Sequence, residues 1–237
     1  MTKGAKKETC YMCDKLEISR EDVPPKCLFP EKKDLPKGFD LRKNLIKVPS
    51  CEDHNLKKSL NDEYLLVILV PHINNNSTAL KHFKSKVMRT LKHSGGLRAK
   101  LFQSIAPVTI NNEETGIIFS ESDRINSVFR HIAKGIHYWH FGEKWFDNII
   151  ITSATRVFLT EKDKLISNQV AFSARKVLES QKTYGDNPEV FFYQAFKSST
   201  PKLTVLRLVF YEGIEVFAVS GTAVDKGLEQ FVQKMKT

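Results

Sequence analysis

The stretch CYMCDKLEISREDVPPKCLFPEKKDLPKGFDLRKNLIKVPSCEDHNLKK, residues 10–58, decides the fold because a pair of metal-binding residue types stands near each end. Cys10 and Cys13 form a C-x-x-C turn, and Cys51 and His54 form a C-x-x-H turn. Three thiolates and one imidazole fill the closed tetrahedral shell of a structural zinc site. Each turn projects two side chains toward one point, which favours zinc over a redox pair or unrelated buried cysteines. We therefore expect these four residues to bind a structural Zn²⁺ ion.

The stretch resembles the zinc-knuckle branch of the HNH (ββα-metal) endonucleases. That family carries C-x-x-C, then an acidic residue and a His before V/I-x-P, then N-L and a second C-x-x-C/H followed by N. The matching residues are Cys10, Cys13, Glu21, Asp22, Val23, Pro25, Asn44, Leu45, Cys51, His54 and Asn55. The resemblance implies a metal-dependent endonuclease, a hydrolase that cuts phosphodiester bonds in DNA. One position departs from the family, because Asp22 stands where the His general base is expected.

Hydrolysis of a phosphodiester requires a divalent ion on the scissile phosphate and a base that activates water. Hard ions such as Mg²⁺ or Mn²⁺ prefer carboxylate and amide oxygens, and Mg²⁺ keeps several waters, so one or two protein ligands suffice. Glu21 and Asn55 can supply these ligands, and Asn44 can hold the hairpin through its amide. The resemblance implies the same three roles.

Three interpretations of Asp22 stay open. An imidazole titrates near neutrality, whereas an ordinary aspartate is a much weaker base. In the first interpretation, Asp22 is a second metal ligand that helps to generate bound hydroxide. In the second, it is a base whose pKa is raised by burial. In the third, it is the sign of a degenerate active site. A degenerate site leaves a zinc protein that binds nucleic acid or a partner protein in a larger complex, for example in a defence or mobile-element system.

The composition is that of a globular chain, and its basic charge is typical either of a protein with an anionic partner or of a merely soluble basic protein. Hydrophobic residues make up 41% of the 237 residues, and the formal net charge is +10. The charge favours nucleic acid, and the resemblance makes DNA the expected form. Cys27 is expected to be a small core residue, outside any disulfide framework. The start of the chain has no apolar signal segment and residues 65–70 are too short to span a bilayer, so we expect a cytoplasmic protein without a membrane partner.

Helices and antiparallel strands occur in blocks, which predicts an α+β fold. Residues 1–72 are expected to form the zinc-stapled ββα-metal unit, with strands at 18–23 and 44–48 and a helix that begins at Asn55. Residues 73–237 are expected to form a mixed helical and antiparallel-sheet domain that binds substrate or a partner. Its expected strands lie within 107–119 and at 149–151, 157–159, 190–196, 203–210 and 214–219, and its expected helices at 79–93, 121–140, 168–181 and 222–235.

The helix expected at residues 79–93 carries a basic face and should end at Gly95-Gly96. Its inward stripe is expected to be Leu80, Phe83, Val87 and Leu91. No acidic residue interrupts residues 81–100. A solvated face is the ordinary interpretation of such a run, and contact with DNA phosphates is the alternative. The candidate nucleic-acid contacts are Lys81, Lys84, Arg89, Lys92, Arg98 and Lys100.

The segment HYWHFGEKWF, residues 137–146, concentrates aromatic side chains after the helix expected at 121–140. Aromatic packing at a corner of the domain is the favoured interpretation. The alternative is a second site or a base-stacking platform formed by His137 and His140 with Trp139 and Trp145.

Overall fold

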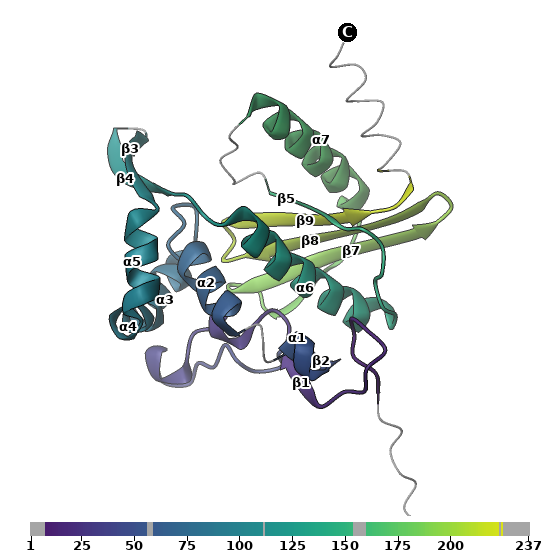
Figure 1. Cartoon of the computed structure of the whole chain (residues 1–237), viewed down its shortest axis with the longest axis horizontal. Coiled ribbons are helices and arrows are strands. Elements are labelled where there is room, and N and C mark those ends of the chain that lie inside the picture. The colour runs from purple at the N-terminus through teal and green to yellow at the C-terminus, as the bar shows by residue number, and fades with distance from the viewer. Residues whose placement is uncertain (1–7, 56–58, 111, 154–159, 223, 225–237) are drawn as a thin grey trace, which may run out of the picture.

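The computed structural model describes residues 8–55, 59–110, 112–153, 160–222 and residue 224. The fold is α+β: two two-stranded antiparallel sheets and one five-stranded antiparallel sheet are combined with helices, and a Cys/His cluster lies beside the first strands (Figure 1). None of the described helices is long and apolar enough to cross a membrane.

The N-terminal unit is a short hairpin followed by one turn of helix. Strand β1 (Ser19–Asp22) pairs antiparallel with β2 (Lys47–Ser50), and α1 (Glu52–Asn55) follows at once. The long connection between the strands contains two 3-10 turns, Lys26–Leu28 and Lys32–Asp34. The first strand is confirmed. The second begins later than predicted because Asn44 adopts φ 53, a left-handed conformation that does not continue a strand.

Helix α2 (Ser59–Leu69) buries Tyr64 and the three residues after it. The spacing of Leu56, Leu60, Tyr64, Leu65 and Ile68 predicts that these residues form the buried seam of a helix that begins at Asn55, and two details of this prediction are wrong. Asn55 ends α1 and does not begin the longer helix, and Leu60 is 72% exposed. Leu56 lies outside the described residues. The apolar seam of α2 is therefore narrower than the spacing of leucines predicts.

Four helical segments follow in succession: α3 (Ser77–His82), a π segment (Phe83–Val87), α4 (Met88–His93) and α5 (Gly95–Gln103). Asn76 caps α3 by accepting a hydrogen bond from the Ala79 N–H, as the Asn-rich linker predicts. The π segment shifts the phase of the buried stripe, so His82 is buried and Leu80 is 53% exposed, contrary to prediction. Gly95-Gly96 opens α5; the break in the helix is at Ser94.

The next elements agree closely with prediction. Strands β3 (Ile105–Ile110) and β4 (Glu113–Ile118) form a hairpin, and α6 (Ser122–Phe141) follows. The helical spacing within 121–140 predicts six inward residues, and all six are buried: Ile125, Val128, Phe129, Ile132, Ala133 and Ile136. This helix has a strict apolar stripe and ends at Gly142, which takes the left-handed conformation of a C-terminal cap.

The five-stranded sheet has the order β5-β9-β8-β7-β6. Its strands are β5 (Ile150–Thr152), β6 (Thr183–Asn187), β7 (Phe191–Ser199), β8 (Lys202–Phe210) and β9 (Ile214–Ser220). Helix α7 (Glu161–Leu178) begins earlier than predicted, and β6 was not predicted because TYGDN is polar and contains glycine. The strand predicted at 157–159 and nearly all of the closing helix lie outside the described residues.

Helices α6 and α7 cover opposite faces of this sheet. Leu206 and Leu208 of β8 belong to the core that contains α6, whereas Val205 packs in a smaller cluster with α7. In Figure 1, β1, β2 and α1 lie on the side of α6 away from α7. The main core contains side chains from both the 1–72 and the 73–237 segments. Helix α6 is therefore the element against which both the hairpin and the sheet pack.

Candidate metal centre

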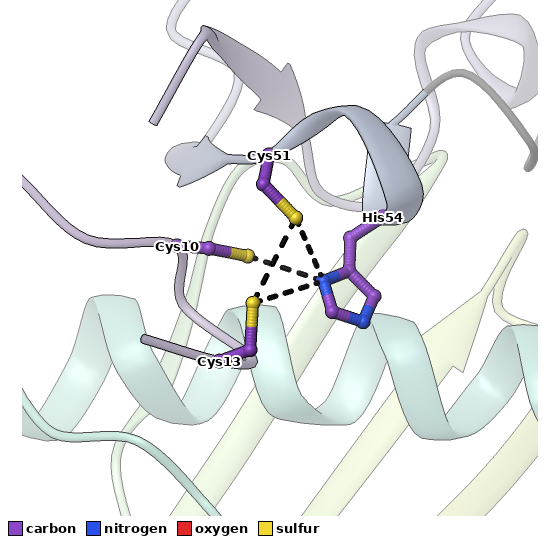
Figure 2. A group of neighbouring side chains, drawn as sticks. All are labelled: Cys10, Cys13, Cys51 and His54. Carbon is purple, nitrogen blue, oxygen red and sulfur yellow. Dashed lines mark hydrogen bonds between the residues drawn. The ribbon is translucent and has the colours of Figure 1, made fainter. Parts of the chain in front are cut away.

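Two short turns bring the four predicted ligands together. Cys10 and Cys13 lie on a loop closed by a β-bridge between Thr9 and Leu16, and the Met12 N–H donates to the Cys10 sulfur at 3.4 Å. Cys51 directly follows β2, and α1 carries His54 one turn later. Figure 2 shows the four side chains pointing toward one point beside the ribbon of α6.

The separations match a tetrahedral metal shell. Sulfurs that are each about 2.3 Å from a zinc ion lie about 3.8 Å apart in a tetrahedron, and a sulfur and a nitrogen about 3.5 Å apart. Here the Cys13 and Cys51 sulfurs are 3.7 Å apart. His54 Nδ1 lies 3.3 Å from the sulfur of Cys10, 3.6 Å from that of Cys13 and 3.2 Å from that of Cys51. The cluster is consistent with a structural metal ion such as zinc, and it confirms that the four residues form one site.

Local electrostatics differ among the ligands. Burial raises the pKa of the Cys13 thiol. Burial acts the same way on Cys51, but hydrogen bonds from the His54 backbone N–H and the neighbouring thiols outweigh it and lower the pKa of Cys51. Burial lowers the pKa of His54, which favours the neutral imidazole that a metal requires.

Charged side chains fasten the cluster to its surroundings. Lys144, which follows α6, donates to the Cys13 carbonyl at 2.7 Å and to Asp14 at 2.8 Å. Lys15 pairs with Asp53 at 2.5 Å and so joins the first turn to the second. These contacts hold both halves of the cluster in register.

Glu21 is buried beside the cluster, at 6% exposure. The Tyr11 hydroxyl donates to one carboxylate oxygen at 2.7 Å, and the Ser50 hydroxyl donates to the other at 3.2 Å. Burial, reinforced by the charge of Glu21, raises the pKa of Tyr11 well above its usual value. Because Tyr11 lies between Cys10 and Cys13 in sequence, its hydrogen bond ties the Glu21 carboxylate to the loop that carries these two cysteines.

The four predicted catalytic residues fall into two groups. The Asn55 side-chain amide donates to the Ser19 hydroxyl at 2.6 Å, and Ser19 shares a strand face with Glu21 because side chains alternate. Glu21 and Asn55 are thus brought to one side of the hairpin. Alternation directs Asp22 to the other face, where its Oδ1 is buried without a hydrogen-bond partner among the described residues. Asn44 lies in the exposed turn before β2.

The six predicted nucleic-acid contacts also divide. Five of these side chains are exposed: Lys81, Lys84, Lys92, Arg98 and Lys100. Arg89 instead donates hydrogen bonds to Asp34 from its two terminal guanidinium nitrogens, at 2.8 and 2.5 Å, and these bonds lower the pKa of that carboxyl. Hydrogen bonds from Lys33 and Lys86 lower the pKa of the adjacent Glu31 to about 2. Arg89 therefore fastens α4 to the 31–34 turn, whose acids are distant in sequence.

Sequence reasoning missed Tyr11 and Ser50 as partners of Glu21, and His131 as a neighbour of the cluster. The ring centroid of His131, on α6, lies 6.2 Å from that of His54. A tyrosine inside a C-x-x-C turn is a visible signal for a buried ring, but its hydroxyl partner depends on strand register. Nothing in the local sequence around His131 points to the metal turns.

No protein-family model matches this chain, and neither does any curated protein or solved structure.

Proposed function

We propose that the chain is a zinc-stapled, metal-dependent endonuclease of the HNH type that hydrolyses phosphodiester bonds in DNA. One observation carries the proposal. The Cys10, Cys13, Cys51 and His54 cluster holds a strand–strand–helix unit in which β1 presents Glu21 and α1 presents Asn55 on the same side of the hairpin. This is the order of elements, with an acidic residue and an amide in the corresponding places, that the resemblance implies.

Two metal ions have distinct roles in this proposal. A zinc ion bound by the Cys₃His cluster is structural, because all four tetrahedral positions are filled by side chains. Glu21 and Asn55 supply hard oxygen ligands, which suit Mg²⁺ or Mn²⁺. When bound there, such an ion would polarise the scissile phosphate and stabilise its developing charge.

The protein side chains orient this second site. Tyr11 and Ser50 fix the Glu21 carboxylate by donating to its two oxygens, and Ser19 fixes the Asn55 amide. Asp22 faces away from Glu21 by strand alternation, which argues against both carboxylates binding one ion.

The charge distribution supports an anionic substrate. The chain carries a net charge of +10, and the five exposed cations on α3, the π segment, α4 and α5 lie on a stretch of sequence without acidic residues. Phosphate contacts of this kind provide affinity that falls steeply as salt rises. DNA is the substrate that this charge and the Glu21 site together favour.

The test is cleavage of supercoiled plasmid by purified, zinc-replete protein in Mg²⁺ or Mn²⁺. We expect Glu21→Gln to slow single-turnover nicking about 100-fold or more, because it removes a charged metal ligand. Glu52→Gln, which changes an exposed acid on α1, is the matched control and should cut at the parental rate. The zinc content of each variant checks that the proposed Cys₃His site still binds its ion. Parental cleavage by zinc-replete Glu21→Gln would contradict the proposal.

A second candidate is a nucleic-acid-binding protein that does not cut. The observation in its favour is Asp22, a carboxylate at the position where the family carries an imidazole. Salt-sensitive DNA binding by zinc-replete protein, with intact plasmid in both metals, would favour this candidate over the nuclease.

A further inference from the structure

The aromatic corner at residues 137–146 serves two different purposes. His137 and Trp145 are buried and stack at 4.9 Å, and Trp145 is 3% exposed, so these two confirm the packing interpretation. Trp139 is 55% exposed, although it lies on the same helix, α6, as His137. Packing therefore accounts for Trp145, whereas more than half of the Trp139 surface stays open to solvent.

Trp139 lines a pocket of about 180 Å³ at the end of the β1–β2 hairpin. Pro24 and Asn44 line it from the hairpin, and Tyr184 and Asp186 line it from β6. Pockets for drug-sized ligands are about 300–1,000 Å³, so this one suits a single flat ring system better than a whole cofactor.

Contacts among the lining residues define the shape of the pocket. Tyr184 and Tyr193 stack with centroids 5.4 Å apart and planes 23° apart, and Tyr193 stacks in turn on Phe191. The Asn187 side chain donates to the Lys43 carbonyl at 3.0 Å, which fastens the Asn44 turn to β6. The aromatic wall and the polar rim are thus fixed relative to one another, as a selective site requires.

The rim has the chemistry to recognise a nucleotide. Asn44 and Asp186 are exposed and present amide and carboxylate groups, which hydrogen-bond the edges of bases. Lys43, Lys47 and Lys182 are exposed nearby in sequence, and the Lys182 ammonium lies 5.4 Å from the Tyr184 ring. A flat aromatic wall with cations around it is the arrangement by which proteins hold unpaired nucleic-acid bases.

Helix α6 links the pocket to the proposed nuclease site. His131 contacts the metal cluster through His54, Gly135 lies against Val23, and Trp139 lines the pocket. These three residues are four apart, so they share one face of the helix and span about 12 Å along it. Stacked nucleotides rise about 3.4 Å each, so this distance corresponds to a few nucleotides.

We propose that this pocket holds one unpaired nucleobase, stacked on Trp139, a few nucleotides from the phosphate at Glu21 and Asn55. The inference rests on the proposed function for its choice of ligand. A base within a duplex is stacked and paired on both sides and does not enter such a pocket, so the preferred substrate contains a single-stranded or extruded nucleotide. The pocket then determines which DNA structures are bound.

The test uses tryptophan fluorescence of the full-length, zinc-replete protein without Mg²⁺ or Mn²⁺, so that binding is measured apart from cleavage. A single-stranded oligonucleotide should quench the parent, and the same strand with abasic residues should bind about tenfold or more weakly. Trp139→Phe should lose the quenching, because only the buried Trp145 remains.

A matched pair of variants isolates the pocket. Trp139→Ala should weaken binding of the intact strand about tenfold or more in fluorescence anisotropy, whereas Phe146→Ala, an exposed aromatic of the same corner outside the pocket, should leave it unchanged. Equal affinity for intact and abasic strands, or equal effects of the two variants, would overturn the proposal. Base-dependent binding without plasmid cleavage would contradict the nuclease proposal alone. Cleavage without base-dependent binding would contradict the nucleobase-pocket proposal alone.

Discussion

The N-terminal unit and the five-stranded sheet are stabilised in different ways, although both pack on α6. The sheet is covered by α6 on one face and α7 on the other, so its strands bury apolar side chains on both sides. The hairpin of residues 19–50 has two four-residue strands, and the Cys/His cluster, which could hold a metal ion, lies at its end. A unit of about fifty residues buries too little apolar surface to be stable alone. The comparison predicts that metal removal unfolds one region and spares the other.

The largest expected effect comes from removing one ligand. Cys51→Ser should release the metal and expose the backbone of residues 8–55 to hydrogen exchange, because structural zinc contributes roughly 10 kcal/mol of binding free energy. Amides of β7, β8 and β9 should stay protected, since these strands also bury apolar side chains against α6 on one face and α7 on the other. Cys27→Ser, which changes the one cysteine outside the cluster, is the control. Uniform loss of protection in both regions would contradict the contrast.

A smaller effect tests the contact between the N-terminal unit and the five-stranded sheet. Tyr211, between β8 and β9, is hydrogen-bonded to the Leu28 carbonyl and to Nδ1 of His82. Burial lowers the pKa of His82 to about 4. The unfolded side chain binds its proton near pH 6.5, whereas the folded one stays neutral down to about pH 4. The free energy of unfolding is therefore highest above pH 6.5 and falls by about 3 kcal/mol as the pH drops from 6.5 to 4.

Chemical denaturation between pH 7 and pH 4 checks this dependence. His82→Gln stays neutral, so its free energy of unfolding should fall less than that of the parent, whereas exposed His93→Gln should follow the parent. The stabilisation from the Glu31 interactions should be lost at lower pH, between about 4.5 and 2, because hydrogen bonds from Lys33 and Lys86 lower the pKa of that carboxyl. Parallel curves for the parent and His82→Gln would refute the assignment.

The smallest effect concerns the contact of the hairpin with α6. A methyl group added at Gly135 would lie 2.8 Å from the methyl groups of Val23. Overpacking of this kind costs about 1–3 kcal/mol, while alanine gains up to about 1 kcal/mol over glycine within a helix. We expect Gly135→Ala to lower the free energy of unfolding by about 1 kcal/mol. The double variant with Val23→Ala should show less than the sum of the two single losses, and strict additivity would exclude the contact.

Prediction from sequence succeeded where one local rule decides the outcome. The C-x-x-C and C-x-x-H turns predicted the metal cluster, and the apolar stripe of Ser122–Phe141 predicted α6 because every turn repeats it. It failed where the phase of a helix changes. The π segment Phe83–Val87 exposes Leu80 and buries His82, and no pattern of leucines indicates such a turn.

The candidate site shows the same limit. Arg89 looks like a free cation in sequence because its partners, Asp34 and Glu31, lie on a distant turn. Glu21 and Asp22 look like one acidic pair, yet strand alternation separates them and only Glu21 faces Asn55. The residue types of a site can be predicted from spacing, whereas the face on which each side chain lies depends on register and tertiary packing.

The most direct measurement is the metal content of the purified chain, by native mass spectrometry together with elemental analysis. The account predicts one zinc ion per chain in the parent and in Cys27→Ser, and none in Cys51→Ser. A parent that is free of metal, while residues 8–55 remain protected from hydrogen exchange, would contradict it.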